Sequence, residues 1–305
     1  MQGDTVLLQT ALDLTVYLEK PTTEELNELV ALYRQICPPD RFLKYKIAEV
    51  RFSFDDIEEP KALTRQGRQA HQAGEPLPFL VPVRSRITAG RPFELQFWDG
   101  QKVKPHAFSF RQIRLEGELH SFLRVLIPLD YDPNTLWGIA QRIADRVQII
   151  SGHGGLVFLY DPGEKFDAFT QIYDLATRWW GVEVEDLNLT LPLMKTAIKG
   201  ANWITMLGPR FLETVRGTVS FENLKQEPDI KLLSAQNAQL IRAGDKPAPC
   251  DRDCPDPSMD PYIAVARALE PLYLESHESF RGHGFLDNGK TLGWYRRFLD
   301  PAGWP

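Results

Sequence analysis

Apolar and polar residues along the chain follow two periods, which predict alternating strands and helices. Residues 5–18 and 45–54 alternate between apolar and polar side chains, as strands do. Between them, apolar residues recur at helical spacing from Leu26 to Ile36, after a threonine cap and early acidic residues. The double proline at 38–39 ends this predicted helix.

The middle of the chain predicts antiparallel strands followed by a helix. Turn residues rich in Gly and Pro separate the apolar segments, which are 79–87, 93–98, 107–114 and one strand within 116–129. Asp132 begins a predicted helix that runs to about Ile150. The segment Ser151–Gly155 is interpreted as a glycine-rich turn, and residues 156–160 as a short buried strand.

The C-terminal half mixes further helices with strands. Helices are expected at 165–180, 209–216, 259–269 and 291–299, and strands at 218–224, 230–235 and 238–241. This order predicts the α+β class, with a mixed, largely antiparallel sheet and packed helices. We expect one domain over residues 1–305, and a division into two lobes, about 1–127 and 128–305, is left open.

Composition excludes several classes of protein. The 305 residues are 43% hydrophobic and carry 35 basic and 41 acidic side chains, a net charge of −6, which disfavours binding to nucleic acid. No apolar stretch is long enough to cross a bilayer and no signal peptide is found, so no membrane is expected. Three cysteines (Cys37, Cys250 and Cys254) are too few for a disulfide scaffold, and the expected compartment is the cytoplasm. A homo-oligomer is left open.

Two segments suggest chemistry. Ser151-Gly152-His153-Gly154-Gly155 is similar to the oxyanion loop of esterases, but the chain has no G-x-S-x-G turn to accompany it. The loop Cys250–Cys254 holds two thiols and two carboxylates, but a structural zinc site needs a second such pair. We therefore predict no catalytic residue, no metal and no cofactor. A hydrolytic or metal-dependent enzyme that uses His153 or this loop is the alternative.

Four segments carry a resemblance to a known family. The segment 198–208 (IKGANWITMLG) resembles, in outline and order, the corresponding part of the type VI secretion immunity family, and the similarity continues at 240–244, 262–271 and 294–298. The motif positions, interpreted as structural, are Gly200, Asn202, Trp203, Gly208, Tyr262, Arg267 and Trp294. Family members usually carry a Gly-Asp-rich segment where this chain has its two cysteines, Cys250 and Cys254.

The resemblance implies an immunity protein, not an enzyme. Such a protein binds and neutralises a cognate type VI toxin, here a nuclease, and so protects the cell that makes it. Carboxylates at the surface would complement a basic nuclease groove. The candidate partner-binding residues form three acidic clusters: Asp55, Asp56, Glu58 and Glu59; Glu183, Glu185 and Asp186; and Asp251, Asp253 and Asp256. A secretion adaptor or scaffold without inhibitory role is the second alternative.

Overall fold

The computed structural model describes most of the chain. The described residues are 8–36, 44–47, 50–53, 91–99, 101, 103–115, 117–217, 221–254, 257–280 and 282–304. The strand expected at 79–87, the acidic cluster at 55–59, Cys37 and Asp256 lie outside them.

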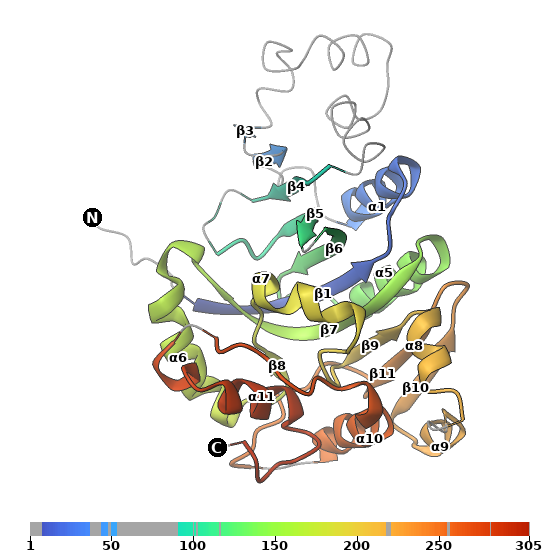
Figure 1. The fold of residues 1–305 in the computed structure, drawn as a ribbon, viewed down its shortest axis with the longest axis vertical. Helices are drawn as coiled ribbons and strands as arrows, with labels where there is room; N and C mark the ends of the chain where they lie inside the picture. The colour runs from blue at the N-terminus through green and yellow to red at the C-terminus, as the bar shows by residue number, and fades with distance from the viewer. Residues whose placement is uncertain are drawn as a thin grey trace.

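One large sheet organises the described residues (Figure 1). It has eleven strands, in the order β10-β11-β9-β7-β1-β6-β5-β4-β2-β3, and β8 adds to β7 as the one parallel pair. The strands are β1 (Leu8–Leu18), β2 (Lys44–Ile47), β3 (Val50–Ser53), β4 (Phe93–Trp98), β5 (Ala107–Leu115), β6 (Glu118–Ile127), β7 (Ile149–Tyr160), β8 (Val182–Glu183), β9 (Ile204–Leu207), β10 (Ile230–Ser234) and β11 (Gln239–Ala243).

Helices cover the sheet and confirm the α+β class. The α-helices are α1 (Thr23–Ile36), α5 (Pro133–Arg146), α6 (Lys165–Arg178), α7 (Leu187–Thr190), α8 (Pro209–Thr214), α9 (Phe221–Gln226), α10 (Asp260–Ala268) and α11 (Asn288–Arg296). Short 3-10 helices are η4 (Pro162–Glu164), η5 (Leu191–Lys195), η6 (Pro257–Met259), η7 (Glu270–Leu272) and η8 (His283–Phe285). Because β1 lies between β6 and β7, strands from both predicted lobes share this sheet. The division into lobes stays a prediction.

The two faces of the sheet differ in chemistry. On β1, Leu12, Leu14 and Val16 point to one face, where the ring of Tyr33 on α1 packs 5.5 Å from that of Phe108. The opposite face carries Asp13 and Thr15. The segment that contains α7 and η5 lies over that second face (Figure 1). Helices therefore pack on the apolar face. The segment that lies over the polar face carries charged side chains of its own.

The glycine-rich segment at 151–155 is not a turn. It lies inside β7, and the helix expected to reach Ile150 ends at Arg146. A Cβ at Gly152 or Gly154 would lie 3.0 or 2.9 Å from backbone oxygens of β1. The glycines therefore allow close packing around β7, which turn propensity alone does not reveal.

Two further segments differ from the sequence prediction. The described residues of the strand expected at 45–54 form the antiparallel pair β2 and β3, not one strand, because the alternating pattern is the same in both. The described part of 218–224 starts the helix α9, and Leu224 is its buried residue. A helix this short with a single buried residue shows no repeating apolar spacing, so the sequence pattern could not distinguish it from a strand.

Candidate functional site

The acidic cluster at Glu183, Glu185 and Asp186 lies inside the protein. Each of these residues is only 2% exposed. The expectation that they form a cluster at the surface is therefore wrong, and the partner-binding role assigned to them stays a prediction. Burying a carboxylate costs free energy unless an opposite charge accompanies it, and each of these three has a cationic partner in the fold.

Lys199 is the central cation of this buried cluster. Its Nζ lies 2.6 Å from Oε2 of Glu185 and 3.2 Å from Oε1 of Glu183, and it donates to the carbonyl oxygen of Val184 at 2.9 Å. The ammonium group therefore makes two hydrogen bonds, to Glu185 and to Val184, and an ionic contact with Glu183. The side chain is fully buried. The apolar segment 198–208 therefore carries one charge whose partners lie around β8.

Arg297 and Lys165 complete the charge pairing on the remaining sides. Arg297 binds the second oxygen of Glu183 at 3.2 Å and donates to the backbone oxygens of Trp180 and Trp294. Lys165, at the start of α6, pairs with Asp186. These contacts tie α6, β8 and the C-terminal segment together.

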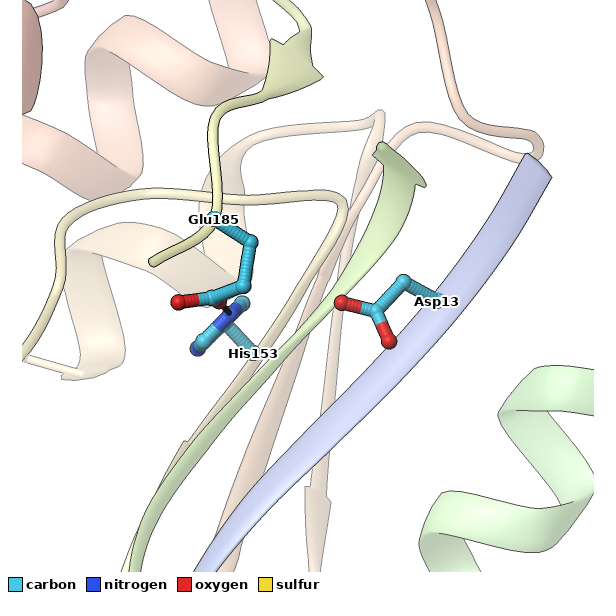
Figure 2. Close-up of side chains that lie close together, drawn as sticks. All are labelled: Asp13, His153 and Glu185. Atoms are coloured by element: carbon cyan, nitrogen blue, oxygen red, sulfur yellow. Dashed lines mark hydrogen bonds and ion pairs between the residues drawn. The ribbon is translucent and has the colours of Figure 1, made fainter. Parts of the chain in front are cut away.

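A second part of the network lies on the polar face of the sheet. Asp13 accepts a two-pronged hydrogen bond from Arg124 on β6, with Nε 3.0 Å from Oδ1, and a further bond from Thr15. Nε2 of His153 lies 3.0 Å from Oε2 of Glu185. Figure 2 shows Asp13 on β1, His153 on β7 and Glu185 beyond β8, with their side chains directed toward one another.

The charges of the network balance. The network contains four carboxylates and four cations. The carboxylates are those of Asp13, Glu183, Glu185 and Asp186, and the cations are Arg124, Lys165, Lys199 and Arg297. Burial alone would raise the pKa of Glu185, but Lys199 and the bond with His153 outweigh it and hold that pKa far below its ordinary value. Lys199 and Arg297 likewise overcome burial and lower the pKa of Glu183. The two glutamates therefore act as buried carboxylates.

The lowered pKa values predict acid sensitivity. Because the pKa values of Glu183 and Glu185 in the folded protein lie below 4.5, the usual glutamate value, ion pairing stabilises the fold above about pH 4.5. This stabilisation is lost as the pH falls further and the folded carboxylates are protonated. Urea unfolding at pH 7, 5, 4 and 3 should show a steep fall below pH 5, and a weaker fall in Glu185→Gln. Equal pH dependence of the two proteins would contradict this assignment.

Asp13, His153 and Glu185 could also be considered as a metal site, since one ligand atom of each lies within 4.8 Å of the others. The surrounding charges argue against this. Both oxygens of Asp13 already bind Arg124, and Oε2 of Glu185 already binds Lys199. A divalent cation would add positive charge to a balanced cluster and displace Lys199. The arrangement fits an ion-pair network better than a metal centre.

Chelation should accordingly leave the protein unchanged. We expect the purified protein to contain less than stoichiometric metal by elemental analysis, and its Tm to be the same with and without EDTA. A tightly held, stoichiometric ion whose removal lowers the Tm would overturn this interpretation and revive the metal-dependent enzyme as an alternative.

The motif residues lie mainly in the core around Lys199. Gly200 has a positive φ of 125°, and a Cβ there would meet the backbone oxygen of Tyr295 at 3.0 Å. Trp203 is 1% exposed, and its ring nitrogen donates to the backbone oxygen of Gly244.

The other motif positions are buried as well, with one exception. The guanidinium of Arg297 stacks 3.6 Å from the ring centre of the fully buried Trp294. Tyr262, Asn202 and Gly208 are also buried, whereas Arg267 is exposed. That these positions are structural stays a prediction.

The third acidic cluster is at the surface in its described part. Asp253 is exposed and Asp251 is partly exposed, and both pair with Arg178 at the end of α6. Cys254 is an exposed free thiol, while Cys250 is buried. The partner-binding role of Asp251 and Asp253 stays a prediction.

Five residues of the network were not predicted from the sequence: Asp13, Arg124, Lys165, Lys199 and Arg297. Lys199 could have indicated the network, because it is the one cation within the apolar segment 197–207 and a buried lysine requires acidic partners.

No described helix combines the length and hydrophobicity that crossing a bilayer requires.

Two known structures from Pseudomonas aeruginosa match this chain. The type VI secretion protein PA0821 matches with a TM-score of 0.75 and 20% sequence identity, over 98% of this chain and 85% of that one, which shows a common fold. The toxic C-terminal tip of CdiA in complex with its immune protein gives a TM-score of 0.24 and 16% identity, over 48% of this chain and 87% of that one. This second TM-score is too low to indicate a common fold. No curated protein matches.

The family comparison covers the region that holds most of the network. The family described as type VI immunity for VRR-NUC, TsiV, matches residues 106–298, which include His153, Glu183, Glu185, Lys199 and Arg297. Because the match spans well over half of the chain, this protein belongs to the TsiV family of type VI immunity proteins.

Proposed function

We propose that this immunity protein binds a type VI toxin with a VRR-NUC nuclease domain and neutralises it by direct contact. The observation that carries the proposal is the family match over residues 106–298. The protein acts through its surface and catalyses no reaction, since the carboxylates and cations of the buried network are paired with one another.

Charge supports a nuclease as the partner. The buried network contains equal numbers of acidic and basic groups, so the excess of six carboxylates in the sequence lies outside it. A nuclease holds phosphates with Lys and Arg side chains. Carboxylates on this protein can occupy the same positions, and opposite charge raises the association rate.

We propose the cytoplasm as the place of action. Cys250 and Cys254 form no disulfide among the described residues, which is compatible with a reducing compartment. A toxin that degrades nucleic acid would have to be blocked in that compartment.

A binding and inhibition experiment tests this proposal. The protein is mixed with the purified VRR-NUC domain of its cognate toxin, and cleavage of plasmid DNA is followed over time. We expect an equimolar amount to stop cleavage and to co-elute with the domain in gel filtration. An unrelated nuclease should remain active, which excludes general competition by an acidic protein.

The other outcomes separate the alternatives. A complex that forms without loss of nuclease activity would favour an adaptor or scaffold. Full activity at excess protein, with no complex, would contradict the proposed function.

A further inference from the structure

We propose that the toxin binds to the exposed face of α6 together with the loop 251–253, and that it presents a groove lined by Lys and Arg. This inference rests on the proposed function and assigns its surface. In Figure 1, α6 lies at the periphery of the molecule beside the C-terminal segments.

The exposed face of α6 is acidic. Glu164, immediately before the helix, and Asp167 and Asp174 on it are exposed and follow one another at helical spacing. Among the described residues none of the three has an ion-pair partner. The basic residue Lys165 is already neutralised by the buried Asp186. The carboxylates on this face are therefore free to bind a cationic partner.

The acidic face continues into the loop 251–253. Arg178, in the last turn of α6, lies 2.7 Å from Asp251 and 3.7 Å from Asp253, so one guanidinium serves two carboxylates. Arg252 lies over the ring of Trp180 and adds a second guanidinium group. The α6 face and the loop together hold five carboxylates, those of Glu164, Asp167, Asp174, Asp251 and Asp253, and two guanidinium groups, those of Arg178 and Arg252. The net charge of this surface is negative.

The loop is fixed to α6 by backbone contacts. Trp180 and Gly181 donate their amide hydrogens to the oxygens of Cys250 and Pro249 at 3.1 and 2.8 Å, and Arg252 donates to the oxygen of Arg178. A Cβ at Gly181 would lie 1.9 Å from the oxygen of Ala248, so the two segments touch. A surface that is ordered before binding loses little entropy when the partner arrives.

Apolar side chains border the acidic stripe. Phe166 and Leu175 on α6 are 45% and 36% exposed, and Leu286, which follows η8, is 58% exposed. The ring of Phe166 packs against that of His283, which joins α6 to the segment of Leu286. Three of the four exposed large apolar residues in the described chain thus border one face. Apolar anchors beside charged groups are typical of protein–protein interfaces.

A charge-reversal experiment with a matched control tests the surface. The test variant carries Glu164→Lys, Asp167→Lys and Asp174→Lys. The control carries Glu24→Lys, Asp130→Lys and Glu227→Lys, which reverse three exposed carboxylates elsewhere that also lack ion-pair partners among the described residues. The Kd for the VRR-NUC domain is measured at 50 and 300 mM NaCl, and the Tm of each variant confirms folding.

We expect the test variant to bind at least about tenfold more weakly at low salt, with a smaller difference at high salt, and the control to stay within about threefold of wild type. Phe166→Ala should weaken binding by about tenfold at both salt concentrations, because its contribution is apolar. Equal Kd values for wild type, test variant and control would overturn the assignment of this surface and leave the proposed function intact. If the wild-type protein itself does not bind the domain, the proposed function fails instead.

Discussion

Replacing Lys199 by Met should lower the free energy of unfolding by about 3–5 kcal/mol, because it leaves two buried carboxylates without their shared cation. Lys199 is completely buried, and its ammonium group contacts Glu183, Glu185 and the oxygen of Val184. Methionine fills a similar volume, so the loss reports the missing charge more than a cavity. The measurement is urea unfolding at pH 7.

Lys195→Met is the matched control for this change. Lys195 forms an ion pair with Glu118 at 2.7 Å, but Glu118 is largely exposed and water compensates for the loss. We expect little change in stability. Adding Glu183→Gln and Glu185→Gln to Lys199→Met should recover part of the loss, since the uncompensated charges are then gone. If Lys199→Met were no more destabilising than Lys195→Met, the buried network would not be a main support of the fold.

Replacing Gly208 by Ala should destabilise the protein by about 3 kcal/mol or more, because the added methyl group meets backbone that cannot move aside cheaply. A Cβ at this position would lie 1.9 Å from the oxygen of Ile149 and 2.7 Å from that of Ile150, at the start of β7. The amide of Gly208 also donates to the oxygen of Ile150, which fixes the close approach. The measurement is again the free energy of unfolding.

Gly138→Ala is the control for Gly208→Ala, and we expect it to have the opposite effect on stability. Gly138 lies within α5, and apart from its chain neighbours and the nearby backbone of α5 no atom would come within 4 Å of its added Cβ. Alanine is favoured over glycine inside a helix, so stability should rise by about 0.5–1 kcal/mol. A small effect at Gly208 would mean that β7 and the segment 204–208 are less closely packed than the structure shows.

Local patterns predicted much of the fold. The helices α1, α5 and α6 follow from their apolar spacing, and Thr22 with Glu25 forms the capping pair that starts α1. The alternating segments that became β4, β5 and β6 were likewise readable, because side chains on β-strands repeat every two residues. These elements depend on residues close together in the sequence.

The buried network depends on residues that are far apart. Glu183 binds Lys199 sixteen positions away and Arg297 more than a hundred positions away. The acidic composition of 183–186 therefore indicated a surface, because carboxylates are seldom buried without partners and no partner is adjacent. The glycines of β7 were misread for a similar reason, since their close neighbours belong to β1 and β9. The burial of residues 183–186 and the strand conformation of residues 151–155 both depend on tertiary contacts.

Survival of cells that produce the toxin tests the central claim most directly. The VRR-NUC toxin is induced in a sensitive host together with the wild-type protein, the α6 charge-reversal variant or its matched control, and surviving colonies are counted. If this chain works by binding its toxin, the wild-type protein and the control should restore survival, and the α6 variant should protect less. Cells that die as fast with the folded wild-type protein as without it would contradict the account.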